Sequence, residues 1–117
     1  AGAKNSLYFY SSKNSKYEMI HADRVSIGDS NYLDHTFTNH SFNLTIGDIV
    51  YMTTDGFIDQ NNKERKRFGR VKFINYLQEI SNIEMKEQIN ILKNKLNSYM
   101  ENEDQRDDIT VMGLKII

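Results

Sequence analysis

The fold of this chain is decided by the stretch Ile49-Val50-Tyr51-Met52-Thr53-Thr54-Asp55-Gly56. Its apolar and β-branched residues predict a buried strand, which Asp55 and Gly56 close with a loop. Because Gly56 has no Cβ, the backbone can turn sharply there and leave the Asp55 carboxylate pointing out of the strand end. Asp-Gly is also a frequent turn pair, so this stretch alone leaves a structural and a functional role open.

A second acidic motif, Asp107-Asp108-Ile109-Thr110, opens the last apolar run of the chain. Adjacent acids repel one another, and two acidic strand ends brought together by one sheet would repel further. A hard divalent cation bound by carboxylate oxygens removes that cost, and Arg106 is a candidate for part of the compensation. Solvation of a loop before the strand and the cap of a turn are the competing explanations, so the motif predicts a metal site only in combination with Asp55.

Composition excludes several classes of protein. The chain has 117 residues, a formal net charge of −1 and no cysteine. This size suits one domain, the balanced charge argues against a nucleic-acid partner, and the lack of cysteine excludes disulfides and thiolate metal sites. We see no apolar run long enough for a membrane span and no signal peptide, so we expect no membrane insertion and a cytoplasmic location.

Periodicity predicts an α+β fold in which helices cover one face of a mostly antiparallel sheet. The expected strands are residues 7–10, 17–21, 36–44, 49–54 and 109–116. The first two should form a hairpin, and the strand 36–44 should pair with 49–54 through a turn at Gly47 and Asp48. Residues 68–80 are expected to form one helix, and Ser81 and Glu84 have the spacing of a capping box that starts a second.

Two apolar stripes mark the faces of these helices that should pack on the sheet. They consist of Phe73, Leu77 and Ile80 in the first helix, and of Met85, Ile89, Leu92, Leu96 and Tyr99 in the second. Three histidines, His21, His35 and His40, lie in separate elements without the spacing of metal ligands, so we interpret them as structural or surface residues. The basic run 63–67 reads as a solvated loop, with guidance of an anionic substrate as the alternative.

A series of short motifs along the whole chain resembles one known family. The motifs are Ala1-Gly2-Ala3-Lys4-Asn5-Ser6-Leu7-Tyr8, Ala22-Asp23-Arg24, Ile27-Gly28, Thr38-Asn39-His40, the run from Gly47-Asp48 to Asp59-Gln60, Arg67-Phe68-Gly69 and Asp107-Asp108-Ile109-Thr110-Val111. In order and spacing the chain resembles the C-terminal half of bacterial PPM-type (protein phosphatase 2C-like) serine/threonine phosphatases, in the branch named after stage II sporulation protein E.

The resemblance implies a four-layer α-β-β-α sandwich with two Mg²⁺ or Mn²⁺ ions between mostly antiparallel sheets. In that family, water bridging the two ions attacks the phosphorus of phosphoserine or phosphothreonine. By motif match, Asp55 is expected to be one metal ligand and Asp107 another. Asp108 occupies a position that is Asp or Asn in relatives, and is expected to be an auxiliary ligand or a neighbour of the ligands.

The motifs of the family's N-terminal half, which supply the ligands that bridge both ions, have no counterpart in residues 1–117. We therefore expect the C-terminal portion of a single phosphatase domain, inactive when isolated. The resemblance leaves open a membrane link of the parent, since relatives are often fused to sensor, response-regulator or membrane-linked HAMP modules. The expected substrate is a phosphorylated protein, such as an anti-sigma-factor antagonist. A non-catalytic regulatory binding module with the same fold is the rival function. An uncovered sheet, with its edge at residues 7–10, also predicts a homo-oligomer.

Overall fold

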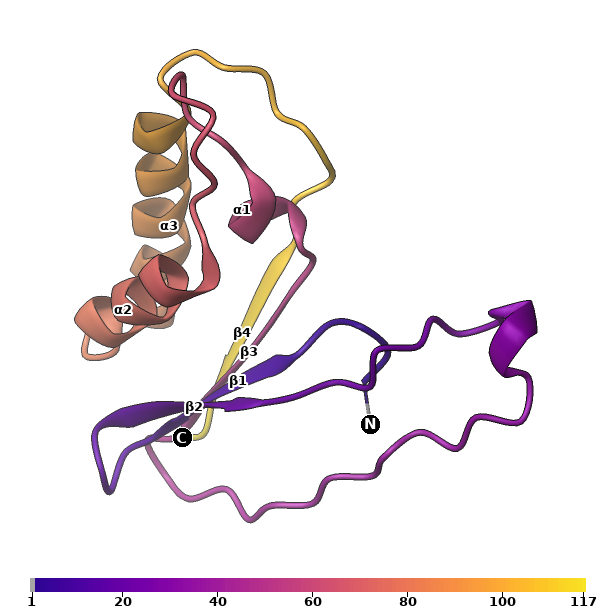
Figure 1. Ribbon diagram of the computed structural model, residues 1–117. Helices are drawn as coiled ribbons and strands as arrows, with labels where there is room; N and C mark the ends of the chain where they lie inside the picture. Colours follow the sequence, from indigo (N-terminus) through magenta and orange to yellow (C-terminus); the bar gives the residue numbers. More distant parts are fainter. Residues whose placement is uncertain (1) are drawn as a thin grey trace.

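The computed structural model describes residues 2–117, which form one sheet with helices on one side (Figure 1). The strands and helices follow one another along the chain as β1 (Leu7–Ser11), β2 (Lys16–Ile20), a 3-10 turn (Ser30–Tyr32), β3 (Ile49–Thr53), α1 (Gly56–Asp59), α2 (Arg70–Ile80), α3 (Met85–Met100) and β4 (Val111–Lys115). The α+β class is therefore confirmed. The short helix α1, directly after Asp55, has no counterpart in the sequence prediction.

All four strands are antiparallel, in the order β2-β1-β3-β4. The predicted hairpin of β1 and β2 is confirmed, with Tyr8 opposite Met19. Tyr8 also lies opposite Tyr51 of β3, so β1 is an inner strand. The expectation that residues 7–10 form an open edge is therefore wrong, because β2 and β3 occupy both sides of β1.

The predicted strand over residues 36–44 is wrong. These residues form an extended loop, seen at the bottom and right of Figure 1, and the positions beside β3 are taken by β1 and β4. The apolar residues Phe37, Phe42 and Leu44 do not alternate regularly, so they offer no continuous face to a sheet. Phe42 instead packs its ring 5.2 Å from that of Phe9.

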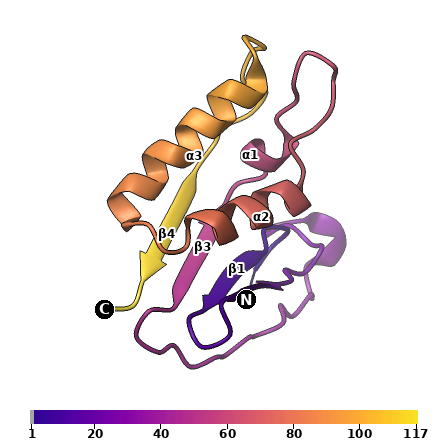
Figure 2. The same ribbon diagram turned by 90° about the vertical axis from the view of Figure 1, so that its left-hand side faces the viewer.

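The helices α2 and α3 cover one face of the sheet, as Figure 2 shows from the helical side. The core between these layers contains the buried side chains Tyr8, Tyr10, Ile49, Tyr51, Phe57, Phe68, Phe73, Leu77, Ile80, Leu92 and Leu96. Phe73 lies 5.2 Å from Tyr8 and 5.0 Å from Phe57, in both cases between ring centroids. The predicted stripe of α2 is thus confirmed, and it fixes α1 against the sheet.

The start and the inner face of α3 differ from the prediction. Ser81 is the C-cap of α2, where its hydroxyl donates to the Gln78 carbonyl oxygen at 2.9 Å, so it does not cap α3. The inner face of α3 holds Gln88, which is buried and accepts a hydrogen bond from the Tyr51 hydroxyl, whereas Ile89 is 59% exposed. Gln88 faces the sheet because the buried Tyr51 hydroxyl needs a hydrogen-bond acceptor there. A pattern of apolar residues alone could not predict this.

The opposite face of the sheet is apolar and has no helix over it, although Phe42 packs on it against Phe9. Met52, Met112 and Leu114 project from it with 47%, 57% and 56% of their surface exposed. One helical layer and one sheet layer of the predicted four-layer sandwich are therefore present in residues 2–117. None of the helices in these residues has both the length and the apolar character needed to cross a membrane.

Candidate metal centre at one end of the sheet

Thr54 joins the two acidic motifs at one end of the sheet. Its amide N–H donates to the Thr110 carbonyl oxygen at 3.1 Å, and its hydroxyl donates to the Asp108 carbonyl oxygen at 2.9 Å. The Thr110 N–H in turn donates to the Thr54 hydroxyl oxygen at 2.9 Å. These three hydrogen bonds continue the β3–β4 pairing past the strand ends and hold the second motif beside Asp55.

Gly56 allows the two segments to approach more closely than any other residue would. A Cβ at this position would lie 2.4 Å from the Asp108 carbonyl oxygen and 3.0 Å from its carbonyl carbon. Both are main-chain atoms, so a side chain could be accommodated only by moving the backbone. The glycine of the Asp55-Gly56 motif is therefore required for the close contact with Asp108.

The three predicted ligand residues are exposed and accessible to solvent ions. The Asp107 carboxylate accepts a hydrogen bond from the Asp108 N–H at 2.7 Å, which orders the loop around the pair. Within residues 2–117, Asp55, Asp107 and Asp108 form no ion pair with a basic side chain, Arg106 included. Their negative charge is therefore left for another cation, and carboxylate oxygens are the donors that Mg²⁺ and Mn²⁺ prefer.

The donor chemistry fits these ions, but the described residues supply only part of a coordination shell. No group of three or more His, Cys, Asp or Glu side chains is arranged in residues 2–117 so as to hold a metal ion. Mg²⁺ requires a near-octahedral shell of oxygen ligands. One or two carboxylates fill only part of such a shell. Asp55 and Asp107, with Asp108 beside them, would thus be one side of such a site.

Gln60 anchors the loop that carries Asp107 and was not predicted from sequence. It is fully buried, and its side-chain amide donates to the Asp104 carbonyl oxygen at 3.0 Å while its side-chain oxygen accepts from the Arg106 N–H at 3.2 Å. A glutamine four residues after Gly56 gives no sign of burial in the sequence. Its contacts across 44 and 46 positions of sequence explain why only the structure shows them.

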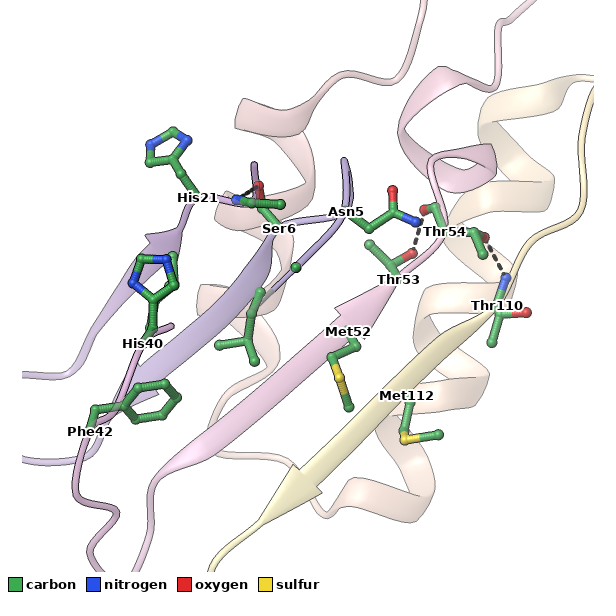
Figure 3. A pocket seen from close by; sticks show the side chains of 14 residues that line it. Asn5, Ser6, His21, His40, Phe42, Met52, Thr53, Thr54, Thr110 and Met112 are labelled. Carbon is green, nitrogen blue, oxygen red and sulfur yellow. Dashed lines mark hydrogen bonds between the residues drawn. The ribbon is translucent and has the colours of Figure 1, made fainter. Parts of the chain in front are cut away.

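A cavity of about 400 Å³ opens on the uncovered face of the sheet, at the same end as the acidic motifs (Figure 3). Its wall includes Thr53 and Thr54, which lead into Asp55, and Thr110, which follows Asp108. His21 and His40, separate in the sequence, both line it, and Figure 3 shows their imidazoles on the side away from Thr54 and Thr110. Both are exposed, and His35 lies outside the cavity.

Three of the four basic side chains in the run 63–67, all except Arg65, pair with nearby carboxylates. Lys63, Lys66 and Arg67 pair with Glu101, Glu64 and Asp59 at 3.0, 2.8 and 3.2 Å. All six side chains are exposed, and each pair stabilises the fold by about 1 kcal/mol at most. This pattern fits the solvated loop of the sequence interpretation, because pairing leaves Arg65 as the single base of the run without an ion pair and a surface that attracts anions needs a cluster of unmatched positive charge.

Comparison with known proteins defines the class of the fold. The SiaA-PP2C domain of Pseudomonas aeruginosa matches with a TM-score of 0.87 and 29% sequence identity, covering 99% of this chain and 45% of that one. The chain therefore has the fold of part of a PP2C-type phosphatase domain and spans less than half the length of the solved domain. Among curated proteins, the comparison finds no significant match.

The family follows from the sequence model of stage II sporulation protein E (SpoIIE), which matches residues 1–117. The chain belongs to this family, whose PP2C-type members are serine/threonine phosphatases. The resemblance seen in the sequence motifs is thereby confirmed. Membership also implies dependence on metal ions in general terms.

Proposed function

We propose that this chain forms part of a metal-dependent phosphatase that hydrolyses phosphoserine or phosphothreonine in a protein substrate of bacterial signalling. The observation that carries the proposal is the contact of the two acidic motifs through Thr54 and Gly56. It brings exposed carboxylates without basic partners to one sheet end, in a chain of the SpoIIE family. Asp55 and Asp107 are the proposed ligands, and Asp108 supports them.

Bound Mg²⁺ or Mn²⁺ would lower the pKa of a water molecule and neutralise charge on the phosphoryl group. The chain's own residues contribute the placement of the carboxylates. Thr54 fixes the main chain of the second motif by hydrogen bonds, Gly56 permits its close approach, and Gln60 restrains the loop before it. Since loss of a ligand or of its support misplaces the nucleophile, these residues should affect turnover strongly.

The substrate we propose is a small phosphorylated regulator, such as an anti-sigma-factor antagonist, acted on in the cytoplasm. The complete protein would combine this segment with the remaining ligands of a two-ion centre. Because the described residues provide an incomplete shell, the isolated chain should hydrolyse p-nitrophenyl phosphate with Mn²⁺ slowly or not at all. A non-catalytic regulatory binding module with the same fold is the rival function.

Metal binding and hydrolysis in the complete protein separate these candidates. Asp55→Asn and Asp107→Asn should each lower Mn²⁺-dependent phosphopeptide turnover by about 100-fold or more. Asp104→Asn is the matched control, since Asp104 lies in the same exposed loop and contacts Gln60 only through its main-chain oxygen. Normal turnover of Asp107→Asn would refute the ligand assignment, and a complete protein that hydrolyses no phosphopeptide would favour the binding module.

A further inference from the structure

Residues 61–67 form a short hairpin that is ordered by its own main chain. The Asn62 N–H donates to the Lys66 carbonyl oxygen at 3.0 Å, and the Arg65 N–H donates to the Asn62 carbonyl oxygen at 2.8 Å. The Asn62 side-chain oxygen also accepts hydrogen bonds from the N–H groups of Glu64 and Lys66, at 3.1 and 3.0 Å. One asparagine therefore organises the whole turn and fixes the residue at its tip, Arg65.

The 61–67 hairpin is attached to both segments that carry the acidic motifs. Arg67 pairs with Asp59 at 3.2 Å, in the helix α1 that follows the first motif directly. Lys63 pairs with Glu101 at 3.0 Å, in the loop that leads to the second motif. The Tyr99 hydroxyl of α3 donates to the Arg67 carbonyl oxygen at 2.9 Å. Figure 2 shows the hairpin projecting past α1, at the end of the molecule where β3 ends and β4 begins.

These contacts leave one base of the hairpin without a carboxylate. Arg65 is exposed and forms no ion pair with any side chain of residues 2–117. The three matched pairs leave little positive charge for long-range attraction of anions. A single guanidinium can nevertheless make a short-range contact of high specificity, because its planar N–H groups bind both oxygens of a carboxylate. Arg65 is thus suited to recognise one acidic side chain of a docked partner.

The backbone of Arg65 is an independent sign that its side chain is used. Its φ of 59° lies in the left-handed region, which glycine and asparagine adopt more readily than arginine. Glycine would form the same turn without this strain, so the hairpin itself does not require arginine at its tip. Strain of this kind is found preferentially at functional sites, and here it accompanies an exposed charge.

The tip of the hairpin lies within the area that a docked protein would cover. One helical turn of about 6 Å leads from Asp55 to Asp59, the ion pair leads on to Arg67, and two residues of at most about 7 Å lead to Arg65. A protein partner covers about 800 Å² on each side, a patch roughly 30 Å across. A substrate whose phosphoryl group lies at the acidic end of the sheet would therefore meet Arg65 with another part of its surface.

We propose that the 61–67 hairpin is a docking surface for the phosphoprotein substrate, in which Arg65 pairs with an aspartate or glutamate carboxylate remote from the phosphorylated residue. This inference rests on the phosphatase function proposed above and adds a recognition element outside the metal centre. It narrows the guidance of an anionic substrate by the basic run to one side chain and one short-range contact. A solvated arginine without a partner is the competing explanation.

Paired phosphopeptides test this contact in the complete protein with Mn²⁺. One peptide carries glutamates about five to seven positions on either side of a central phosphoserine, which is about 17 to 23 Å in an extended chain. The other peptide carries glutamines there. The KM of the wild-type protein should be about 3- to 10-fold lower for the glutamate peptide, as expected for an exposed bidentate ion pair. Arg65→Gln should abolish this preference and leave hydrolysis of p-nitrophenyl phosphate unchanged.

A matched control separates the contact from a general effect of charge. Lys13 is an exposed base in the turn between β1 and β2, at the other end of the sheet, since β1 begins with Leu7 opposite Met52. Lys13→Gln removes the same charge and should preserve the preference, whereas Arg65→Glu should reverse it. Equal loss of the preference in Lys13→Gln and Arg65→Gln would overturn the proposal.

Thermal unfolding tests whether Arg65 serves the fold instead. Arg65→Gly should abolish the peptide preference without lowering the melting temperature, because glycine adopts a positive φ freely. A lower melting temperature of Arg65→Gly would assign the side chain a structural role and refute the docking role.

The docking proposal and the phosphatase proposal fail in different ways. If the complete protein hydrolyses neither p-nitrophenyl phosphate nor the peptides, the phosphatase function is wrong, and fluorescence anisotropy of the two labelled peptides decides whether Arg65 binds the glutamates. If both peptides are hydrolysed with equal KM, the phosphatase proposal stands and the docking role of Arg65 is refuted.

Discussion

Replacing Asp48 with asparagine should destabilise the fold by about 2 to 4 kcal/mol, because its carboxylate joins two loops. Asp48 is only 3% exposed, and it accepts four hydrogen bonds, from the N–H and hydroxyl groups of Ser12 and of Thr45, at 2.8 to 3.0 Å. Asparagine would keep one acceptor oxygen and turn its NH₂ group toward two donors. Two hydrogen bonds to a charged group would be lost, and one of their donors, a main-chain N–H, would be left unpaired.

The same contacts predict that the free energy of unfolding depends on pH. Hydrogen bonds to the carboxylate, led by those from the Ser12 and Thr45 N–H groups, lower the Asp48 pKa from 3.8 to about 2. A lowered pKa in the folded state stabilises the fold above pH 4, and this contribution of about 2 kcal/mol is lost as the pH falls from about 4 to 2. Asp48→Asn should lack this part of the acid sensitivity.

Urea unfolding of the wild-type chain and of Asp48→Asn, followed by circular dichroism at pH 7 and at steps down to pH 2.5, measures both effects. Asp29→Asn is the matched control, since the Asp29 side chain accepts a single exposed hydrogen bond, from the Asn31 N–H at 3.0 Å. We expect the control to change the unfolding free energy by about 0.5 kcal/mol. An Asp48→Asn chain within that range at pH 7, or with wild-type acid sensitivity, would refute the reasoning.

Three further perturbations follow from the contacts described. Gly56→Ala should lower the melting temperature and weaken Mn²⁺ binding to the complete protein, because its Cβ would meet the Asp108 carbonyl oxygen at 2.4 Å; unchanged values would contradict the close contact. Gln60→Ala should speed hydrogen exchange at Arg106 and cost about 2 to 3 kcal/mol of stability, and intact protection there would exclude the anchoring role. The isolated chain should associate through its bare sheet face, so Met112→Lys should reduce association in light scattering, whereas Ile89→Lys, on the helical side, should not; equal effects would place the contact elsewhere.

Local patterns in the sequence predicted the strands around Ile49 and Leu7 and the inner face of α2, because regular spacing of apolar residues is enough to define these elements. The prediction from local patterns failed for residues 36–44. The apolar residues there do not alternate, and they contact β1 through the ring of Phe42. It also failed at Ser81, since the Ser-x-x-Glu spacing does not reveal whether the serine ends one helix or begins the next. Whether a segment joins a sheet, or a serine ends or begins a helix, depends on contacts with distant parts of the chain. Local propensity and residue spacing do not contain this information.

The candidate site was also predicted only in part, because local motifs are visible in the sequence and long-range contacts are not. Asp55 and Asp107 belong to motifs that stand at strand ends, so the sequence indicated them, and the structure brings their main chains together. The distance between their carboxylates remains a prediction. Gln60 and the attachment of the 61–67 hairpin were missed, because each depends on contacts between distant segments, such as that of Lys63 with Glu101.

The hydrogen bonds of Thr54 have a consequence for the order of folding. They join residues separated by 54 and 56 positions, and all three helices lie in the chain between them. Closing so large a loop is entropically costly, and non-local pairing of this kind slows folding. The β1–β2 hairpin and the helices can form early, whereas the pairing of β3 with β4 must wait. The acidic end of the sheet would then be assembled last, and the rate at which a refolding chain acquires metal affinity should report that final step.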